Sequence, residues 1–220
     1  AYGYNAAASI TSGGGPVTVT GTGGGSEDSY GNYGVQSQLG GVITAGGSGT
    51  VHVNGIGGTS SGNNNYGVIL TGASGNGDPA TITSGGGNVV VDGQGGGIAM
   101  SAYNHGITLY NGATLTAGGN GTVTVTGSGG NSNGDFNVGV VVSAKTAAAE
   151  ITSSGGAVSV TGNGGGAGAS AGNYGVEVYY GGTIAAGSRG TVSVVGTGGL
   201  GSGENNYGVH VWGTSESQQA

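Results

Sequence analysis

The carboxylates are the side chains of this chain that could carry acid–base chemistry. Enzymes that cleave polysaccharides need two carboxylates, or a carboxylate with a basic partner, in one cleft. Glu27 and Asp28 form the only adjacent acidic pair, and no Lys or Arg recurs beside them. The nine acidic residues are scattered: Glu27, Asp28, Asp78, Asp92, Asp135, Glu150, Glu177, Glu204 and Glu216. Isolated surface carboxylates are usually solvated, so the sequence predicts no catalytic residue and a protein that is not an enzyme.

Aspartate and histidine could also bind a metal ion. Asp78, Asp92 and Asp135 resemble the acidic positions of glycine-rich calcium repeats, but such repeats need an Asp at a fixed place in successive units of about nine residues. A zinc site needs converging ligands, and the histidines occupy three different positions of the repeat described below: His52, His105 and His210. We expect no metal site and no cofactor, with bound calcium left open.

Regular rows of outward threonines can order water, which is the chemistry of an ice-binding surface. One candidate column recurs once per repeat: Thr11, Thr44, Thr83, Thr116 and Thr152, ending at Ala185. The column expected to lie next to it is mixed: Thr20, Asn54, Asp92, Thr126, Thr161 and Val195. The sequence therefore predicts no flat array of two threonine columns, and an ice-binding module is the weakest functional alternative.

Composition excludes several classes of protein. Of 220 residues, 60 are glycine and only 5% are charged, and the formal net charge is −7 with Lys145 and Arg189 as the only two cations. So few cations cannot neutralise nucleic-acid phosphates or an anionic membrane. No apolar run approaches the roughly 18 residues that span a bilayer, so no membrane insertion is expected. Two prolines and no Gly-X-Y period exclude collagen.

An internal repeat organises the sequence. The tetrapeptide Asn-Tyr-Gly-Val or a close variant begins at residues 32, 65, 104, 137, 173 and 206, and residues 2–4 form a truncated copy. The central glycines set the length of the units: Gly3, Gly34, Gly67, Gly106, Gly139, Gly175 and Gly208. After a first unit of 31 residues, the spacing is 33 to 39 residues. Each unit must therefore fold as one supersecondary element that stacks on the next.

Every unit has two more strand-like segments. The second is centred on an aliphatic residue: Ile10, Ile43, Ile82, Leu115, Ile151 and Ile184. The third begins 7 or 8 residues later with a valine: Val17, Val51, Val89, Val123, Val158 and Val192. The separations of 7 (type A) and 8 (type B) alternate, which gives the order ABABAB.

These features predict an all-β fold, a parallel β-helix (β-solenoid) of about six three-strand coils of 33–39 residues. Alternating valines would face inward and stack between coils at about 4.8 Å, giving a rod roughly 30 Å long. Glycines would supply positive φ at the corners. We expect one solenoid domain over residues 1–212 and a polar tail over 213–220. The glycine-rich stretch before each Asn is interpreted as a loop on one edge, with extra strands or polyproline-II-like segments as the alternative.

The Asn and Tyr of the tetrapeptide are the candidate interaction residues. The Asn amides would hydrogen-bond their equivalents above and below, forming a corner ladder: Asn32, Asn65, Asn104, Asn137, Asn173 and Asn206. The neighbouring tyrosines would stack at the same corner: Tyr33, Tyr66, Tyr174 and Tyr207. His105 and Val138 replace Tyr in two units.

Runs such as residues 43–47 (Ile-Thr-Ala-Gly-Gly) and 121–127 (Gly-Thr-Val-Thr-Val-Thr-Gly) carry a family resemblance. The chain resembles the repetitive passenger regions of autotransporters and filamentous-haemagglutinin-like adhesins over nearly its whole length. The resemblance implies secretion, a cell-surface or extracellular location, and a role in adhesion, matrix or filament formation, and it leaves the handedness of the solenoid open.

Neither end of the repeat carries a polar cap. The unit that would follow the last one is type A, the type with which the chain starts, so copies could continue the pattern head to tail. The alternative is that the chain is an excerpt of a longer repeat protein. The residues expected at this contact are Tyr2, Tyr4, Ile10, Val17, Val19, Val192, Val194, Tyr207, Val209, Val211 and Trp212. The leading hypothesis is a secreted structural protein whose partner is itself, a head-to-tail homopolymer. The alternative is a cell-surface adhesin or glycan-binding stalk with surface glycans as partners.

Overall fold

The computed structural model describes residues 8–72, 78–187 and 189–213. All the regular structure within those residues is β: eighteen strands form three six-stranded parallel sheets, and no helix is present there that could cross a membrane. Each sequence unit is one coil, and each strand pairs with its equivalent one coil away. The predicted β-solenoid of about six coils is therefore confirmed.

The three sheets correspond to the three segments of the repeat. The Ile sheet contains β1 (Ser9–Thr11), β4 (Val42–Thr44), β7 (Thr81–Ser84), β10 (Thr114–Ala117), β13 (Glu150–Ser153) and β16 (Thr183–Ile184). The Val sheet contains β2 (Val17–Thr22), β5 (Val51–Ile56), β8 (Val89–Gln94), β11 (Val123–Ser128), β14 (Val158–Asn163) and β17 (Val192–Thr197). The Tyr sheet contains β3 (Val35–Gln38), β6 (Val68–Thr71), β9 (Ile107–Tyr110), β12 (Val140–Ser143), β15 (Val176–Tyr179) and β18 (Val209–Trp212).

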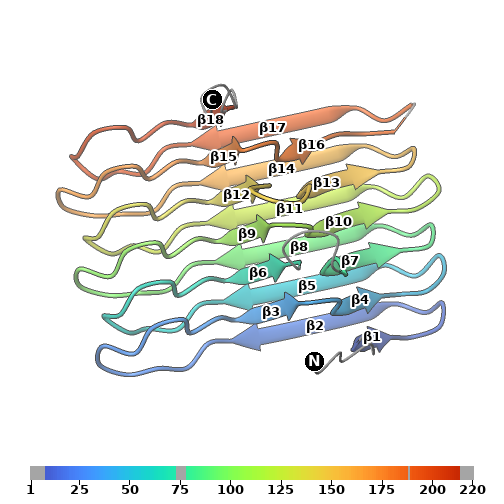
Figure 1. The fold of residues 1–220 in the computed structure, drawn as a ribbon, viewed down its shortest axis with the longest axis horizontal. Helices are drawn as coiled ribbons and strands as arrows, with labels where there is room; N and C mark the ends of the chain where they lie inside the picture. Colours follow the sequence, from blue (N-terminus) through green and yellow to red (C-terminus); the bar gives the residue numbers. More distant parts are fainter. Residues whose placement is uncertain (1–7, 73–77, 188, 214–220) are drawn as a thin grey trace, which may run out of the picture.

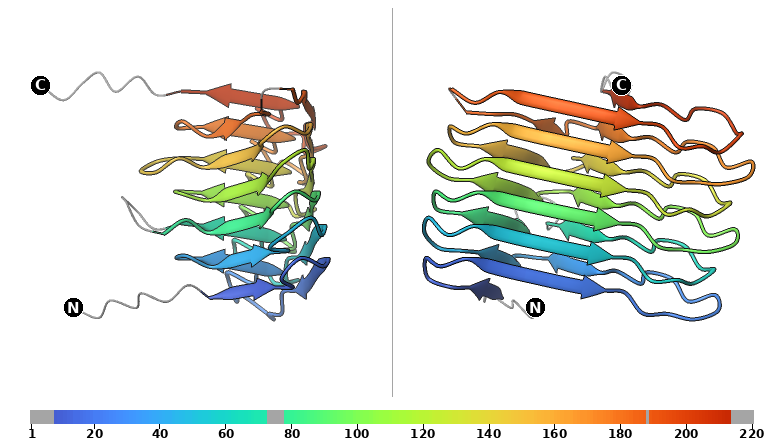
Figure 2. Two further views of the ribbon diagram at one scale, coloured as in Figure 1. Left: turned by 90° about the vertical axis from the view of Figure 1, so that its right-hand side faces the viewer. Right: turned by 180° about the vertical axis from the view of Figure 1, so that it is seen from behind.

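The molecule is a slab rather than the rod expected from the sequence. Six coils at about 4.8 Å rise only about 29 Å, and Figure 1 shows that the longest axis runs along the strands instead of along the stack. The Val-sheet strands point one way and the strands of the other two sheets point the opposite way, so each coil is a flattened loop (Figures 1 and 2).

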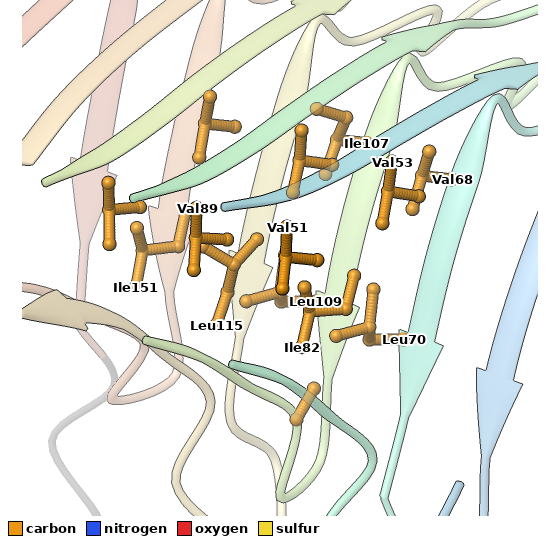
Figure 3. Packing of buried hydrophobic residues seen from close by; sticks show 14 of the residues in the cluster. Val51, Val53, Val68, Leu70, Ile82, Val89, Ile107, Leu109, Leu115 and Ile151 are labelled. Carbon is orange, nitrogen blue, oxygen red and sulfur yellow. The ribbon is translucent and has the colours of Figure 1, made fainter. Parts of the chain in front are cut away.

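The core is built from the predicted inward columns. Val51 and Val53 of the Val sheet are fully buried, as are Val68, Leu70 and Ile82 from the facing strands. Figure 3 shows these side chains filling the space between the sheets. Because parallel pairing keeps the register from coil to coil, like residues lie above like residues along the whole stack.

The alternation of coil types has a local cause at the turn between the Ile and Val sheets. In type A coils, the hydroxyl of Ser84 donates to the carbonyl of Gly87, and Ser12 and Ser153 make the same bond to Gly15 and Gly156. Type B coils have alanine at this position and one additional residue in the turn: Ala45, Ala117 and Ala186. The serine hydroxyl therefore closes the shorter turn.

The glycine-rich stretches form stacked arms at one edge of the slab: residues 23–34, 57–67, 95–106, 129–139, 164–175 and 198–208. In the second to sixth arms, the outgoing backbone limb bonds to the returning limb of the arm before it. The Gly96 amide donates to the Asn65 carbonyl at 2.8 Å, and the Gly130 amide donates to the Asn104 carbonyl at 2.8 Å. The arms are loops on one edge, as interpreted from the sequence, but they repeat the coil-to-coil bonding of the sheets.

The glycine of the tetrapeptide lies at a close contact between two backbones. Gly106 and Gly139 are not among the residues with positive φ. They lie against the fifth residue of the Val-sheet strands: a Cβ placed on Gly127 would be 2.2 Å from the Gly139 carbonyl oxygen. We call the glycines in this contact the glycine spine: Gly21, Gly55, Gly93, Gly127, Gly162 and Gly196 against Gly34, Gly67, Gly106, Gly139, Gly175 and Gly208. Close approach of two backbones, rather than a left-handed turn, requires glycine here.

Candidate functional sites on the corner, the outer Tyr face and the ends

The six tetrapeptide asparagines lie one above another where the arms join the Tyr sheet. Asn32 Nδ2 donates to Asn65 Oδ1 at 2.8 Å, and Asn104 Nδ2 donates to Asn137 Oδ1 at 2.8 Å. The Oδ1 atoms of the last four asparagines also accept from the backbone amide of the asparagine one coil below, as between Asn65 N and Asn104 Oδ1 at 3.1 Å. At the fourth rung, between Asn137 and Asn173, this backbone bond replaces the amide bond, because Asn137 Nδ2 donates to the Gly134 carbonyl instead. Four of the six asparagines are fully buried, so the interior rungs are bonded out of contact with water.

A column of serines joins this ladder and was missed by the sequence reasoning. Ser101 Oγ donates to Asn104 Oδ1 at 2.9 Å, and Ser132 Oγ accepts from Asn104 Nδ2 at 3.1 Å. The four interior members are buried: Ser60, Ser101, Ser132 and Ser170. The ladder and the serine column together form one polar network along the stack. Its donors and acceptors find hydrogen-bond partners because neighbouring side chains repeat at the coil spacing.

The tetrapeptide tyrosines stack in two groups on the outer face of the Tyr sheet. The rings of Tyr33 and Tyr66 are 5.3 Å apart and inclined by 5°, and the His105 ring continues the stack 5.0 Å from Tyr66. Val138 interrupts the column, and Tyr174 and Tyr207 form a second stack with centroids 5.6 Å apart. The corner therefore presents aromatic rings in coil register.

Burial sets the charge state of this face. It lowers the pKa of the His105 imidazole to about 3, and it raises the pKa of the Tyr66 hydroxyl far above its usual range. The Val138 amide also donates to His105 Nδ1 at 3.2 Å, which requires that nitrogen to carry no proton. His105 is therefore neutral at physiological pH.

Further aromatic residues surround a pocket on the same face and were not singled out from the sequence. Tyr110 and Tyr179 come from the strand ends, and Tyr103 lies in an arm with a φ of 58°. The pocket has a volume of about 250 Å³ and is lined by Tyr66, Ile69, Thr71, Tyr103, His105, Thr108, Tyr110, Val141 and Tyr179. Among the described residues, no partner bonds the buried Thr108 hydroxyl. The lining contains no carboxylate, Lys or Arg.

The two ends of the stack expose core columns. Ile10 is 50% exposed although Ile82 in the same column is fully buried, and Val209 is 46% exposed although Val176 is fully buried. A cavity of about 490 Å³ opens at the β1 end, and one of about 410 Å³ opens at the β18 end. The other expected stacking residues of the described chain lie at these ends: Val17, Val19, Val192, Val194, Tyr207, Val211 and Trp212. Tyr2 and Tyr4 lie outside the described residues.

The titratable residues form pairs rather than larger clusters. His52 Nε2 lies 2.9 Å from Asp92 Oδ2, and His210 Nδ1 lies 3.3 Å from Glu177 Oε1. Burial raises the pKa of the Glu177 carboxyl, and the hydrogen bond to His210 opposes that shift. Within the part of the chain that the structure describes, no group of three or more His, Asp or Glu side chains could hold a metal ion.

The comparison of threonine columns made from the sequence was wrong in its geometry. The column of Thr44 lies on the Ile sheet, whereas the column of Thr20 lies on the Val sheet, so the two are not neighbours. The true neighbour lies two residues earlier on the Ile sheet: Ser9, Val42, Thr81, Thr114, Glu150 and Thr183. Paired threonines thus occur in two coils, and Val42, Glu150 and Ala185 interrupt the array.

Comparisons of this chain with protein-family models, with curated proteins and with solved structures gave no match, so the assignment of function rests on the geometry of its own residues.

Proposed function

We propose that this protein is a secreted structural protomer that stacks head to tail into an extracellular filament, sheath or matrix fibre. The observation that carries the proposal is the exposure of the core columns at both ends of the described stack. Within residues 8–72, 78–187 and 189–213, the Ile and Val sheets begin with β1 and β2 of the first coil, and the Tyr sheet begins with β3 of the second. At the other end the Tyr sheet continues one coil further, to β18. In a head-to-tail contact, β18 of one copy and β1 and β2 of the next make up one complete coil.

This arrangement continues every core column. Val209 would lie beneath Val35 of the next copy, Val192 beneath Val17, and Ile184 beneath Ile10. Burial of the exposed apolar surface stabilises such a contact at about 25 cal/mol per Å². The last described coil is type B and the first is type A, so the alternation also continues.

The corner ladder has a free acceptor at one end and a free donor at the other. Within the described chain, Asn32 Oδ1 accepts no hydrogen bond, although each equivalent Oδ1 above it accepts one from the coil below. The Asn173 backbone amide donates to Asn206 Oδ1, whereas within the described chain the Asn206 backbone amide makes no such ladder bond. Stacking brings this amide beneath Asn32 Oδ1 of the next copy, with Tyr207 beneath Tyr33.

The end strands carry no feature that opposes association. Natural edge strands avoid pairing through charges, prolines or bulges. None of the strands β1, β2, β3, β16, β17 and β18 contains Asp, Glu, Lys or Arg. A stack bonded along its axis, with dry Val and Ile columns and few charges, suits a stiff fibre. The resemblance to secreted β-helix adhesins supports an extracellular location.

The test is self-association of the purified chain, followed by sedimentation velocity and negative-stain electron microscopy across a range of concentrations. Wild-type protein should form fibres of uniform width. Val211→Lys should remain monomeric, because Val211 is 71% exposed in the protomer but would bury an unpaired charge at the contact. Val195→Lys is the matched control, because Val195 is exposed on the outer Val-sheet face near the same end. Wild-type protein that stays monomeric throughout, or Val211→Lys protein that assembles as readily as wild type, would overturn the proposal.

A glycan-binding stalk is the second candidate, and the aromatic outer face of the Tyr sheet favours it. Tyrosine rings with an apolar face and a hydroxyl suit ligands that combine apolar and polar surface. The two candidates are compatible, because the outer face stays exposed when the ends are covered.

A further inference from the structure

The Glu177–His210 pair lies on the outer face of the Tyr sheet at the β18 end. The two residues occupy the same column on β15 and β18, and His210 Nδ1 lies 3.3 Å from Glu177 Oε1. The rings of Tyr174, Tyr207 and Trp212 flank the imidazole, with centroids 4.8, 5.6 and 6.2 Å from its own. The His210 side chain is 28% exposed and the Glu177 side chain is 14% exposed. The imidazole is therefore the more exposed member of the pair, and it is also the one nearer the end of the stack.

A head-to-tail contact would cover this pair. Parallel pairing aligns one column along the outer Tyr face: Gln36, Ile69, Thr108, Val141, Glu177 and His210. Continued across the contact, the same register brings Gln36 of the next copy over His210. Gln36 carries no charge, and in the protomer its amide donates to Gln38 Oε1 at 3.1 Å. The contact therefore removes water from the pair and supplies no opposite charge.

The protonation state of the pair decides what this burial costs. Histidine side chains ordinarily gain or lose a proton between about pH 5 and 8. When the imidazole is neutral and Glu177 is ionised, the pair carries a net negative charge. When one proton is added, the pair is neutral and hydrogen-bonded, whichever residue holds the proton. Burying the unbalanced charge costs more than burying the neutral pair, so the assembled pair binds this proton more tightly than the free pair.

The direction of the pH effect follows from this difference in proton binding. A site that binds its proton more tightly in the assembled state stabilises the contact at low pH, and that stabilisation is lost as the pH rises. Burial already raises the pKa of the Glu177 carboxyl, and the hydrogen bond to His210 opposes that shift, so a net negative charge is disfavoured at this site. A second proton would make the pair cationic, which restricts the effect to mild acid.

We propose that the Glu177–His210 pair makes head-to-tail assembly pH-dependent, favouring fibres in mild acid and free protomers in mild alkali. The inference rests on the proposed function and adds a means of control to its contact. The other titratable side chains that face the pair are tyrosines, whose hydroxyls are ordinarily neutral in this range: Tyr174, Tyr179 and Tyr207. From the next copy, Gln36 approaches His210 and Tyr33 approaches Tyr207.

The test is the protein concentration at which fibres form, measured by sedimentation and negative-stain electron microscopy at pH 5.5, 6.5 and 8.0 and constant ionic strength. Circular dichroism at each pH checks that the protein is folded. Wild-type protein should assemble at a concentration about fivefold lower at pH 5.5 than at pH 8.0, because a pKa rise of one unit on assembly corresponds to at most about tenfold in affinity.

Three variants assign the effect to this pair. Glu177→Gln leaves the site neutral at pH 8.0 and cationic at pH 5.5, so it should reverse the preference and assemble better at pH 8.0. His210→Gln removes the imidazole and should abolish the preference for acid. His52→Gln is the matched control, because it removes the other His–carboxylate pair, whose His52 Nε2 and Asp92 Oδ2 lie 2.9 Å apart on the Val sheet; it should keep the wild-type profile. The acidic residues of the first and last arms are the same in every variant: Glu27, Asp28 and Glu204.

The possible failures distinguish this inference from the proposed function. If the wild-type protein assembles equally well at pH 5.5 and 8.0, the inference is overturned and head-to-tail stacking stands. The same holds if Glu177→Gln or His210→Gln keeps the wild-type preference for acid, or if His52→Gln loses it. Wild-type protein that stays monomeric at every pH overturns both.

Discussion

Replacement of Gly127 by alanine tests whether close backbone contact holds the Val and Tyr sheets together at the glycine spine. The added Cβ would lie 2.2 Å from the Gly139 carbonyl oxygen and 2.6 Å from Val140 Cγ2, whereas ordinary contacts begin near 3.4 Å. The two backbones must therefore separate by about 1 Å. Overpacking of this kind costs about 1–3 kcal/mol.

Separation of the backbones also disturbs the coil-to-coil bonds of the same segment. Gly139 N donates to the Tyr174 carbonyl and Val140 N donates to the Gly175 carbonyl, each at 3.0 Å. Weakening these two bonds adds about 1 kcal/mol each. The expected total loss in the free energy of unfolding is about 3–5 kcal/mol.

Urea unfolding followed by circular dichroism measures this loss. Gly86→Ala is the matched control: a Cβ on Gly86 meets no atom within 4 Å and its φ is not positive, so stability should change by less than about 0.5 kcal/mol. The reasoning is refuted if Gly127→Ala unfolds at the wild-type urea concentration, or if the two variants are equally destabilised.

Two further predictions concern the corner. Asn104→Ala should lower the free energy of unfolding by about 3 kcal/mol or more in urea, because buried donors and acceptors of Asn65 and its neighbours lose their partners. Asn120 is exposed, so Asn120→Ala should leave the stability unchanged. Equal effects of the two substitutions would contradict the ladder. His105 is neutral in the fold, with a pKa of about 3. Its contribution to the free energy of unfolding is therefore complete above its unfolded pKa of about 6.5 and is lost as the pH falls. Between pH 7 and 4.5, the wild-type protein should lose roughly 3 kcal/mol more stability than the His105→Tyr variant. Since neighbouring Tyr66 does not titrate there, parallel losses in the two proteins would refute this assignment.

The coil register could be predicted from the sequence because it depends on side chains that repeat at fixed positions. Val51 and Val89 follow Ile43 and Ile82 at nearly constant spacing, and parallel pairing brings equal positions together. The same logic anticipates asparagines at one corner. It fails for the serine column, because the serines precede their asparagines by alternating intervals: Ser60 lies five residues before Asn65, but Ser101 lies three before Asn104.

The pocket could not be predicted from the repeat because it arises where the repeat is broken. Tyr103 occupies a position that holds Gly, Asn or Phe in other coils, and the column of Tyr110 and Tyr179 also holds Gln38, Thr71, Ser143 and Trp212. Their rings converge across several coils, which no single unit of sequence encodes. The close packing of Gly139 was likewise not predicted, because glycine is equally compatible with positive φ and with close packing.

Helical reconstruction of the assembled fibre by electron cryomicroscopy tests head-to-tail stacking most directly. If β18 of each copy completes the first coil of the next, the subunits repeat along the axis every six coils, about 29 Å, and an unbroken spacing of about 4.8 Å between strands crosses each junction. A fibre with side-by-side subunits, or a gap in the strand spacing between copies, would contradict the account.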